Sequence, residues 1–361
     1  MIEVGSHLIM DLARDTLSYC SELVHQGTNW LLVAPLSVRI AGFLVASYGA
    51  YWVWFFRGTR RVRSKVSLDG KTVIITGANA GIGRETAVDL ASRGARVIMA
   101  CRNPTKAQAA LAEVRQRSGS DNVVFKQVDT SDLKSVRAFA DQILKEEDRL
   151  DILINNAGIG GDRNSVQSEG FDIVMTTNHV GHFVLTMALI DLLKKSAPSR
   201  IISVSSLAHV FISDPAMVDY SNKLAEGISV RYRYARSKLA NVHFTKELAR
   251  RLAGTNVTAY SLHPGTIFTN ILKSTLTTVG KKIRYYLFTP LLWLFLLSEK
   301  DGAQTTIYCA IDESVTQHSG GYFANCQLAK ESKLAKDMAL AKQLWDVSCE
   351  ATGIDPNKLS A

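Results

Sequence analysis

Short β-branched runs alternate with longer amphipathic stretches from about residue 66 to the C-terminus. The runs that predict strands are 72–76, 96–100, 122–126, 151–155, 200–204 and 256–261. The stretches that predict helices include 84–92, 106–117, 131–145, 234–252 and an amphipathic C-terminal one at 331–352. Strands that are apolar almost throughout and alternate with helices are typical of a parallel sheet covered on both faces. We therefore predict one α/β domain over 66–361, with a doubly wound parallel sheet.

A different pattern precedes this domain. Residues 40–56 carry no charged side chain, and residues 1–38 are acidic on balance. The apolar run is followed at once by Arg57, Arg60, Arg61, Arg63 and Lys65. About 20 apolar residues span a bilayer, and basic residues favour its cytoplasmic side. We predict a lumenal segment over 1–38, a transmembrane anchor over 39–56, a basic juxtamembrane linker over 57–65 and a cytosolic domain after it.

Two other interpretations of the apolar run are weaker. A buried core helix needs neighbours that could bury it, and the flanking sequence offers none. A secretory signal peptide begins with a basic region, which is missing here. The anchor is therefore the favoured interpretation.

Composition and charge exclude several classes of protein. The chain has 361 residues, of which 47% are hydrophobic and 21% charged, values that fit neither a disordered chain nor a polytopic membrane protein. Five cysteines form no CxxC pair, so we expect a reducing compartment, no disulfide framework and no metal site. Five of the nine excess positive charges lie in the linker rather than over one groove, so we expect no nucleic-acid partner.

A glycine-rich loop, TGANAGIG at 76–83, lies between the first predicted strand and the first predicted helix. Glycine is needed where a tight turn brings bare backbone N–H groups to a pyrophosphate at a helix N-terminus. The glycines depart from the GxGxxG spacing, with three residues and then one between them. The loop predicts a dinucleotide site formed by Gly77, Asn79, Ala80, Gly81, Ile82 and Gly83.

Polar residues also follow the third and fourth predicted strands. NNAG at 155–158 lies where doubly wound sheets bind ligands, and it adds Asn155, Ala157 and Gly158 to the predicted cofactor site. The alternative for this tetrapeptide is an ordinary turn. Asp129 either accepts a hydrogen bond from an adenine amino group or caps the helix that follows.

The end of the second predicted strand bears on the choice of dinucleotide. A carboxylate at this point would bind the ribose 2′-hydroxyl of NAD, but ACRN at 100–103 contains none. Arg102, together with Arg84 just past the glycine loop, suits a 2′-phosphate. We expect NADP(H) in preference to NAD(H), the alternative being that both arginines are only solvated.

Candidate acid–base chemistry lies in YARSK at 234–238, which places Tyr234 and Lys238 on one helical face. A tyrosine with a pKa near 10 is a poor catalyst at neutral pH, and a neighbouring cation stabilises its phenolate and lowers that pKa. Alone, this spacing is common in exposed pairs. Upstream, Ser205 and Ser206 end the fifth predicted strand, where a hydroxyl can bind a substrate carbonyl, and Asn178 could hold a water in a proton path.

Three histidines near these residues also invite a catalytic interpretation. The spacing around them does not match a metal site, so we expect them to be packing or surface residues: His179, His182 and His209.

Taken together and in this order, the motifs resemble those of the short-chain dehydrogenase/reductase family. The resemblance covers about residues 66–325 and rests on TGxxxGxG, NNAG, the asparagine, the serine, YxxxK and Pro264-Gly265. Further segments, such as NHVGHF at 178–183, VSSLAH at 204–209 and HPGT at 263–266, resemble its microsomal retinol dehydrogenase-like branch.

The resemblance implies a Rossmann fold and a catalytic tetrad of Asn178, Ser206, Tyr234 and Lys238. Ser206 matches better than Ser205, and only Tyr234 stands four residues before Lys238. It further implies that Pro264, Gly265, Thr266 and Thr269 join Tyr234 and Lys238 in contacting the cofactor, although hydroxyls in such turns often only cap. The implied reaction is hydride transfer between nicotinamide and a carbonyl carbon, with Tyr234 moving the proton.

The implied substrate is an apolar, membrane-borne aldehyde or ketone of retinal-like character, or the corresponding alcohol. Residues 285–297 are uncharged and aromatic-rich, follow a basic flank and lie in a predicted lid over 266–300. A buried core helix or a dimer surface is the alternative for this run, so a homo-oligomer stays open. We expect a single-pass protein of the endoplasmic reticulum, with a mitochondrial membrane as the alternative. A reductase for steroids or other lipid carbonyls, or a non-catalytic nucleotide- or lipid-binding protein, remains the competing function.

Overall fold

A computed structural model describes residues 35–58, 61–160, 170–222, 224–225, 227–265 and 297–359, and for 52–58, 230 and 231 the backbone alone. The chain divides into two compact units, Met1–Thr59 and Arg60–Ala361, and each is described by itself. The predicted lumenal segment lies outside the described residues apart from its last four, as does most of the predicted lid.

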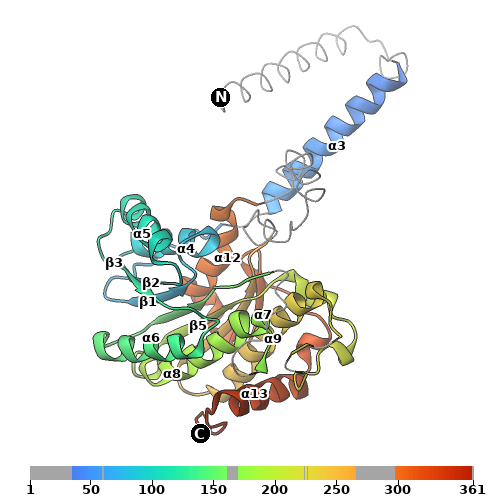
Figure 1. Cartoon of the computed structure of the whole chain (residues 1–361). Helices are drawn as coiled ribbons and strands as arrows, with labels where there is room; N and C mark the ends of the chain where they lie inside the picture. Colours follow the sequence, from blue (N-terminus) through green and yellow to red (C-terminus); the bar gives the residue numbers. More distant parts are fainter. Residues whose placement is uncertain are drawn as a thin grey trace. The chain divides into compact units, whose positions relative to one another are not determined.

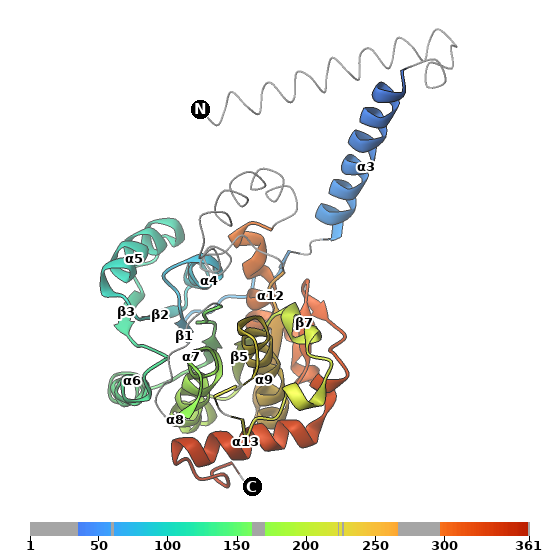
Figure 2. The ribbon, with the colours of Figure 1, turned by 45° about the vertical axis from the view of Figure 1, so that its right-hand side comes forward.

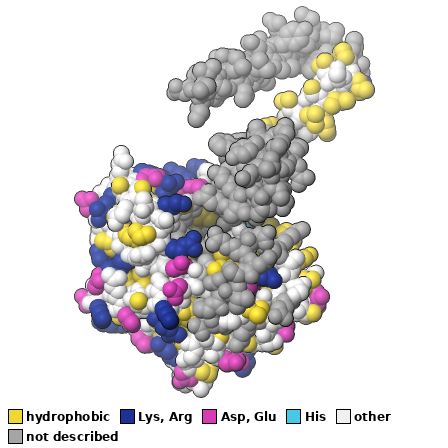
Figure 3. Space-filling view, viewed as in Figure 1, with side chains coloured by type: hydrophobic (Ala, Val, Ile, Leu, Met, Phe, Trp, Pro, Cys, Tyr) yellow, Lys and Arg dark blue, Asp and Glu magenta, His cyan; other side chains and the backbone are white. Residues whose placement is uncertain are grey.

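The first unit contains a single described helix, α3 (Leu36–Gly58), which includes the whole predicted anchor. Pro35 directly precedes the helix, and its carbonyl accepts hydrogen bonds from the backbone N–H groups of Val38 and Arg39. Large apolar side chains in the first half of α3 are exposed, Phe43 to 72% and Val45 to 71%, as Figure 3 shows along this helix. A helix of 23 residues with exposed apolar side chains in its first half is therefore present near the N-terminus.

Among the described residues, one stretch is long and apolar enough to cross a membrane, Ile173–Lys195, but 94% of its most apolar window is buried inside the protein. It consists of a short helix α7 (Ile173–Met175), a π-helical turn η2 (Thr176–Val180) and helix α8 (Gly181–Lys195). Its apolar side chains belong to the core of the second unit. The described side chains of α3 form a shorter apolar segment, Leu36–Tyr51.

The second unit is built on an eight-stranded sheet with the order β3-β2-β1-β4-β5-β6-β7-β8. The strands are β1 (Thr72–Thr76), β2 (Arg96–Cys101), β3 (Val123–Gln127), β4 (Ile152–Asn155), β5 (Ser199–Val204), β6 (Val257–His263), β7 (Tyr322–Ala324) and β8 (Gln327–Leu328). All neighbouring strands pair in parallel except β7 and β8, which are antiparallel.

Helices cover both faces of this sheet (Figures 1 and 2). One layer consists of α4 (Gly81–Ser92), α5 (Pro104–Ser118) and α12 (Glu299–Ile311). The other consists of α6 (Leu133–Glu146), α8 and α9 (Val230–Arg251), with α13 (Met338–Thr352) packed on α9. Successive residues of β1 enter opposite layers, Ile74 one core and Val73 and Ile75 the other. The strands are thus apolar throughout because both of their faces are buried, which confirms the predicted doubly wound fold.

The predicted elements agree with the structure at their centres and differ at several ends. The C-terminal helix begins at Met338 rather than 331, because Asp337 caps it by accepting from the N–H groups of Ala339 and Leu340. A 3₁₀ turn, η6 (Leu334–Lys336), precedes it. Likewise α6 begins at Leu133 because Asp132 is its N-cap. Helix α12 and strands β7 and β8 were not predicted as elements.

Arg61 and Val62 of the basic linker belong to the second unit and pack on its helix α12. A guanidinium nitrogen of Arg61 lies 2.7 Å from the Asp301 carboxylate, and the Val62 N–H donates to Gln304 Oε1 at 3.0 Å. Both acceptors belong to the first turns of α12. Arg61 is therefore an ion-pair partner of α12, besides its place in the predicted juxtamembrane charge cluster.

Candidate active site

The glycine-rich loop lies where the order of the strands reverses, between β1 and its two neighbours β2 and β4. Ligands of doubly wound sheets bind at the carboxyl ends of the strands at this point. The loop turns with φ of +68° at Gly77 and +58° at Gly81, backbone conformations that favour glycine. The Gly77 N–H donates to the Ala100 carbonyl at 2.8 Å, which ties the loop to the end of β2.

Close packing against Asn156 and Gly77 explains why residue 83 is a glycine. A Cβ on Gly83 would stand 2.5 Å from both Asn156 Nδ2 and the Gly77 carbonyl oxygen. A Cβ on Gly77 would stand 3.0 Å from Ala157 Cα. Asn156 Nδ2 in turn donates to the Thr76 carbonyl at 2.8 Å. The glycine loop and NNAG therefore form one packed unit.

Thr76 and His182 hold this unit together. Thr76 Oγ1 accepts from the N–H groups of Asn156 and Ala157, each at 2.9 Å. His182 Nδ1 lies 3.1 Å from the Asn178 carbonyl and must donate to it, so its Nε2 accepts from the Thr76 hydroxyl at 2.9 Å. Burial lowers the pKa of His182 to about 4, which keeps this ring neutral.

Sequence reasoning missed Asn156, Thr76 and His182 as site residues. His182 was interpreted only as packing or surface, whereas it is buried and links the cofactor loop to Asn178. Thr76 could have been identified as a site residue because it is the polar residue at the end of the first predicted strand.

Asn155, which was predicted to contact the cofactor, points away from the loop. Its side chain is 1% exposed, and its Nδ2 donates to Thr186 Oγ1 of α8 at 3.0 Å. Asn155 is the last residue of β4, and adjacent residues of a strand face opposite sides. The neighbour Asn156, rather than Asn155, is thus the asparagine that contacts the glycine loop.

The N-terminus of α4 fits a pyrophosphate. Its N-cap, Ala80, has an extended backbone and no side chain that could cap the helix, and no acidic residue lies in its first turn. The leading N–H groups of a helix carry partial positive charge and attract anions. The half-buried Asn79, Ala80, Gly81 and Ile82 line this turn, as expected of a dinucleotide loop.

The two arginines expected at the 2′-phosphate lie in different environments. Arg102 follows β2 with a side chain that is 59% exposed, and its Nε is 3.9 Å from Asp129 Oδ2. Arg84 pairs with three carboxylates: Nη1 lies 2.8 Å from Glu113, Nη2 3.1 Å from Glu299 and Nε 3.8 Å from Glu85. Arg102 is therefore the more available of the two.

Asp129 takes part in a local turn rather than capping α6. Its Oδ1 accepts from the N–H and the hydroxyl of Ser131, at 2.9 and 2.7 Å. The cap of α6 is Asp132. The second carboxylate oxygen of Asp129 faces Arg102.

Asn178 lies in the π-helical turn η2, and its amide binds the chain just after NNAG. Its Oδ1 accepts from the Ile159 N–H at 2.8 Å, and its Nδ2 donates to the Ile159 carbonyl at 2.9 Å. The same Nδ2 lies 2.9 Å from Ser237 Oγ, which donates to the Tyr234 carbonyl at 2.8 Å. Asn178 thus connects the end of β4 to the helix that carries Tyr234.

Tyr234, Ser206 and Lys238 come together at the carboxyl ends of β4 and β5. The Tyr234 side chain is half-buried, and Lys238 Nζ lies 5.7 Å from the centre of its ring. Burial raises the pKa of Tyr234, while a hydrogen bond with Ser206 acts in the opposite direction. The net shift is therefore upward and not the expected lowering, because desolvation of the phenolate dominates.

Lys238 is the more strongly perturbed group. Its side chain is 3% exposed, and burial lowers the pKa of its ammonium to about 8. Nζ donates to the Val204 carbonyl at 3.0 Å and lies close to Gly158, on which a Cβ would stand 3.3 Å from it. Glycine at 158 leaves room for both Lys238 and Asn178, whose Oδ1 would be 3.2 Å from the same Cβ.

The two neighbouring serines have different environments. Ser205 is buried, and its hydroxyl donates to the Lys238 carbonyl at 2.6 Å. Ser206 is half-buried, and its Oγ accepts from the Ala208 N–H at 3.1 Å, which leaves its proton for Tyr234 or a substrate. Ser206 is therefore the serine that meets Tyr234.

Ser206 caps a short 3₁₀ helix, η3 (Leu207–Phe211), that is anchored by His209. His209 is fully buried, its Nδ1 donates to the Ser206 carbonyl at 2.7 Å, and its Nε2 accepts from the Ser332 N–H at 3.3 Å. The other large side chains of this turn are exposed, Leu207 to 48%, Val210 to 38% and Phe211 to 51%. An apolar surface therefore begins directly beside Ser206.

Pro264 and Gly265 follow β6 at the same edge of the sheet. Gly265 has a φ of +94°, and a Cβ on it would stand 2.4 Å from Leu297 Cδ1. Thr266 and Thr269 lie outside the described residues, so their predicted cofactor contacts stay predictions.

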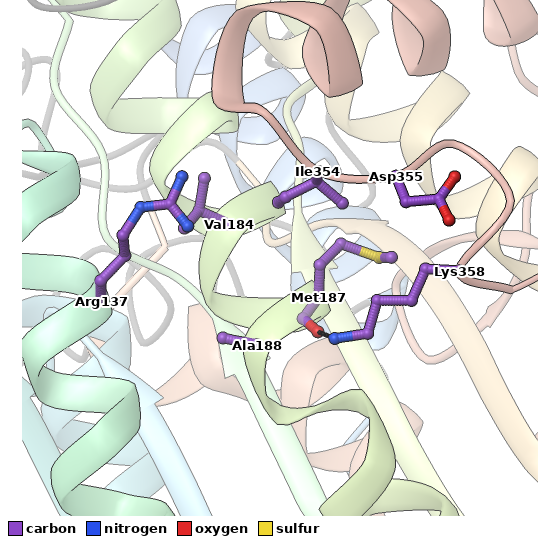
Figure 4. A pocket seen from close by; sticks show the side chains of 7 residues that line it. All are labelled: Arg137, Val184, Met187, Ala188, Ile354, Asp355 and Lys358. Atoms are coloured by element: carbon purple, nitrogen blue, oxygen red, sulfur yellow. Dashed lines mark hydrogen bonds between the residues drawn. The ribbon is translucent and has the colours of Figure 1, made fainter.

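A separate cavity of about 210 Å³ lies between α6, α8 and the chain end (Figure 4). Val184, Met187 and Ile354 give it an apolar floor, and Lys358 Nζ donates to the Met187 carbonyl at 2.8 Å. None of the proposed catalytic residues lines it.

Comparison with known proteins agrees with this geometry. The family profile described as "short chain dehydrogenase" matches residues 71–279. The chain is 44% identical to retinol dehydrogenase 11 of Mus musculus and to retinol dehydrogenase 12 of Homo sapiens, in each case over 292 residues that cover 81% of this chain and 89% of the relative. It is 41% identical to retinol dehydrogenase 14 of Mus musculus over 337 residues, which cover 87% of this chain and 97% of that protein.

Solved structures show the same fold. An uncharacterized protein from Mycobacterium paratuberculosis superposes with a TM-score of 0.62 at 33% identity, covering 80% of this chain and 95% of the other. The residue patterns, the sheet and these relatives lead to one conclusion: the chain belongs to the short chain dehydrogenase family and is an oxidoreductase that acts on CH–OH groups.

Proposed function

We propose that this protein is an NADP(H)-dependent oxidoreductase that interconverts an apolar, membrane-borne aldehyde or ketone of retinal-like character and its alcohol. One observation carries the proposal: Tyr234 lies beside the buried ammonium of Lys238 and interacts with Ser206. Ser206 is the N-cap of η3, whose large apolar side chains are exposed. The names of the relatives support the substrate class, since three of them are retinol dehydrogenases.

The proposed chemistry uses four side chains. The nicotinamide, when bound, supplies or accepts a hydride. Tyr234 gives a proton to the carbonyl oxygen of the substrate during reduction and takes it back from the alcohol during oxidation. Ser206 donates its free hydroxyl proton to the same oxygen as negative charge develops on it.

Lys238 and Asn178 act on the tyrosine rather than on the substrate. With a pKa of about 8, the Lys238 ammonium is still mostly charged at pH 7, and its charge favours the transient phenolate of Tyr234. Asn178 positions Tyr234 through Ser237 and fixes the backbone at Ile159.

The NADP(H) preference rests on the end of β2. No carboxylate follows this strand in the segment 100–103, and Arg102 is largely exposed there. A guanidinium at this position suits a 2′-phosphate, with which it forms charge-assisted hydrogen bonds. Arg84 would add to this site once it leaves one of its carboxylate partners.

The proposed setting is a membrane, with α3 as a single anchor and the second unit in the cytosol. The exposed apolar surface of α3 and the basic residues that follow it support this topology. The endoplasmic reticulum is the proposed membrane, since the sequence patterns match the microsomal branch of the family.

The test is NADPH and NADH oxidation by the purified full-length protein in detergent, with all-trans-retinal and with a small soluble aldehyde. Wild type is expected to reduce retinal with NADPH, and Tyr234→Phe is expected to bind NADPH but lose at least a hundredfold in rate. Tyr232→Phe, two residues away, serves as the matched control and should stay active. Absence of wild-type activity on every apolar carbonyl tested would favour a non-catalytic binding protein instead.

The apolar surface of η3 allows a second, independent arm. Leu207→Gln, at an exposed position, is expected to raise KM for retinal and to leave turnover of the small aldehyde unchanged. Equal loss on both substrates would contradict the proposed role of η3 in binding the apolar part of the substrate.

A further inference from the structure

A carboxylate from a distant part of the chain lies against the phosphate-binding turn. Glu299 is the first residue of α12, and its Oε1 would stand 3.9 Å from a Cβ on Gly81, the first residue of α4. Its Oε2 lies 3.1 Å from Arg84 Nη2, in the first turn of the same helix. Helices α12 and α4 pack along their lengths, which holds Glu299 in this position.

This position is one that an anion favours. Helix α4 begins without a capping side chain and without an acidic residue in its own first turn. The partial positive charge of its leading N–H groups therefore acts on whatever negative charge is nearest. In this structure Glu299 provides such a charge from outside the helix.

We propose that Glu299 is an internal competitor for the phosphate groups of the dinucleotide and sets the affinity of the enzyme for its cofactor. The inference rests on the proposed function, because it assumes that the dinucleotide binds at the glycine loop. A pyrophosphate beside Gly81 and Ile82 meets the repulsion of the Glu299 carboxylate, so the carboxylate must turn away or weaken binding. In both cases the dinucleotide binds to the glycine loop more weakly than it would without the Glu299 carboxylate.

Arg84 links this competition to the proposed 2′-phosphate. Glu299 and Glu113 bind its terminal nitrogens, and Glu85 Oε1 lies 3.8 Å from its Nε, so the charge of Arg84 is compensated within the protein. Release of Glu299 leaves Arg84 with one fewer carboxylate partner. Removal of the Glu299 charge is therefore expected to tighten NADH binding, because the pyrophosphate is no longer repelled. NADPH binding should tighten for the same reason and also because Arg84 becomes more available to the 2′-phosphate.

Glu113 provides a matched control. It also pairs with Arg84, at 2.8 Å, and its side chain is 37% exposed against 35% for Glu299. It lies on α5, however, and also pairs with Arg117 at 2.9 Å. A variant at Glu113 thus perturbs Arg84 without removing a charge from the first turn of α4.

The experiment measures equilibrium binding of NADPH, NADH and adenosine to full-length wild type, Glu299→Gln and Glu113→Gln in detergent, by calorimetry at low and high salt. We expect Glu299→Gln to lower Kd for both dinucleotides by roughly threefold to tenfold at low salt, to lower it less at high salt and to leave adenosine unchanged. Glu113→Gln is expected to change Kd for NADH by less than twofold.

Several results would overturn the proposal. An unchanged or higher Kd for both dinucleotides in Glu299→Gln, with an unchanged melting temperature, excludes competition by this carboxylate. Equal tightening of NADH by Glu113→Gln assigns the effect to Arg84 instead. A lower melting temperature in Glu299→Gln directs the test to Glu299→Ala, which must tighten both dinucleotides for the proposal to stand. Wild type that binds neither dinucleotide refutes the proposed function itself, and the inference with it.

Discussion

Replacement of Lys238 by methionine is expected to stabilise the protein while it removes the activity. Lys238 is 3% exposed, and burial lowers the pKa of its ammonium from 10.5 to about 8. The difference corresponds to about 3 kcal/mol by which the charged lysine lowers the free energy of unfolding at neutral pH. Loss of its hydrogen bond to Val204 costs about 1 kcal/mol, since Asn241 Nδ2 still donates to that carbonyl at 3.1 Å. The expected net gain is about 2 kcal/mol.

The gain in stability of Lys238→Met depends on pH, and the lowered pKa of Lys238 determines how it changes. Between about pH 8 and pH 10.5 the lysine is charged in the unfolded chain and neutral in the folded one. The unfolded state then binds more protons, so the free energy of unfolding of wild type rises with pH in this window. Below pH 8 the whole cost of the buried charge is present. Methionine does not titrate, and the advantage of Lys238→Met therefore disappears towards pH 10.5.

Urea unfolding of the full-length proteins in detergent, followed by tryptophan fluorescence, measures this difference at pH 7 and pH 10. Lys238→Arg is the control that keeps the charge and should gain no stability. A Lys238→Met protein that is less stable than wild type at pH 7, or whose advantage is the same at both pH values, would refute the reasoning. Retained retinal reduction by Lys238→Met would separately refute the proposed role of the ammonium.

Three further outcomes are expected. Gly83→Ala places a Cβ 2.5 Å from Asn156 Nδ2, so it should cost about 1–3 kcal/mol in thermal unfolding and weaken NADPH binding in calorimetry. His182→Phe breaks the chain from Thr76 to Asn178, and kcat should fall at least tenfold, with partial rescue in His182→Gln. Asn256 is exposed and begins an Asn-Val-Thr sequon, and it should carry no glycan in mammalian cells if the second unit is cytosolic. A mobility shift on treatment with an endoglycosidase would reverse the proposed orientation.

Local patterns were sufficient to predict the layered fold and the loops at the strand ends. The first predicted strand, 72–76, has the bounds of β1, because a run of β-branched residues flanked by glycine leaves little ambiguity. Helix ends that depend on a single capping residue were harder to predict. Asp132 and Asp337 each begin a helix later than its amphipathic pattern suggests, since the residues before them already have helical spacing.

The site was less predictable where it depends on which side of a strand a side chain faces, or on partners that are distant in sequence. Asn155 and Asn156 are identical in type, and only the register of β4 decides which one faces the glycine loop. Glu113 and Glu299, which hold Arg84, lie 29 and 215 residues away in the chain. The pKa of Tyr234 depends on how deeply the folded chain buries it, and spacing from Lys238 carries no information on burial.

The short turn η3 both holds Ser206 in place and presents an apolar surface. His209 donates a hydrogen bond to the Ser206 carbonyl from the buried side of the turn, while Leu207 and Val210 of the same five residues are exposed. A change that shifts this turn therefore shifts the Ser206 backbone as well, whereas a substitution at an outward side chain alters the apolar surface and leaves the hydrogen bond of His209 in place.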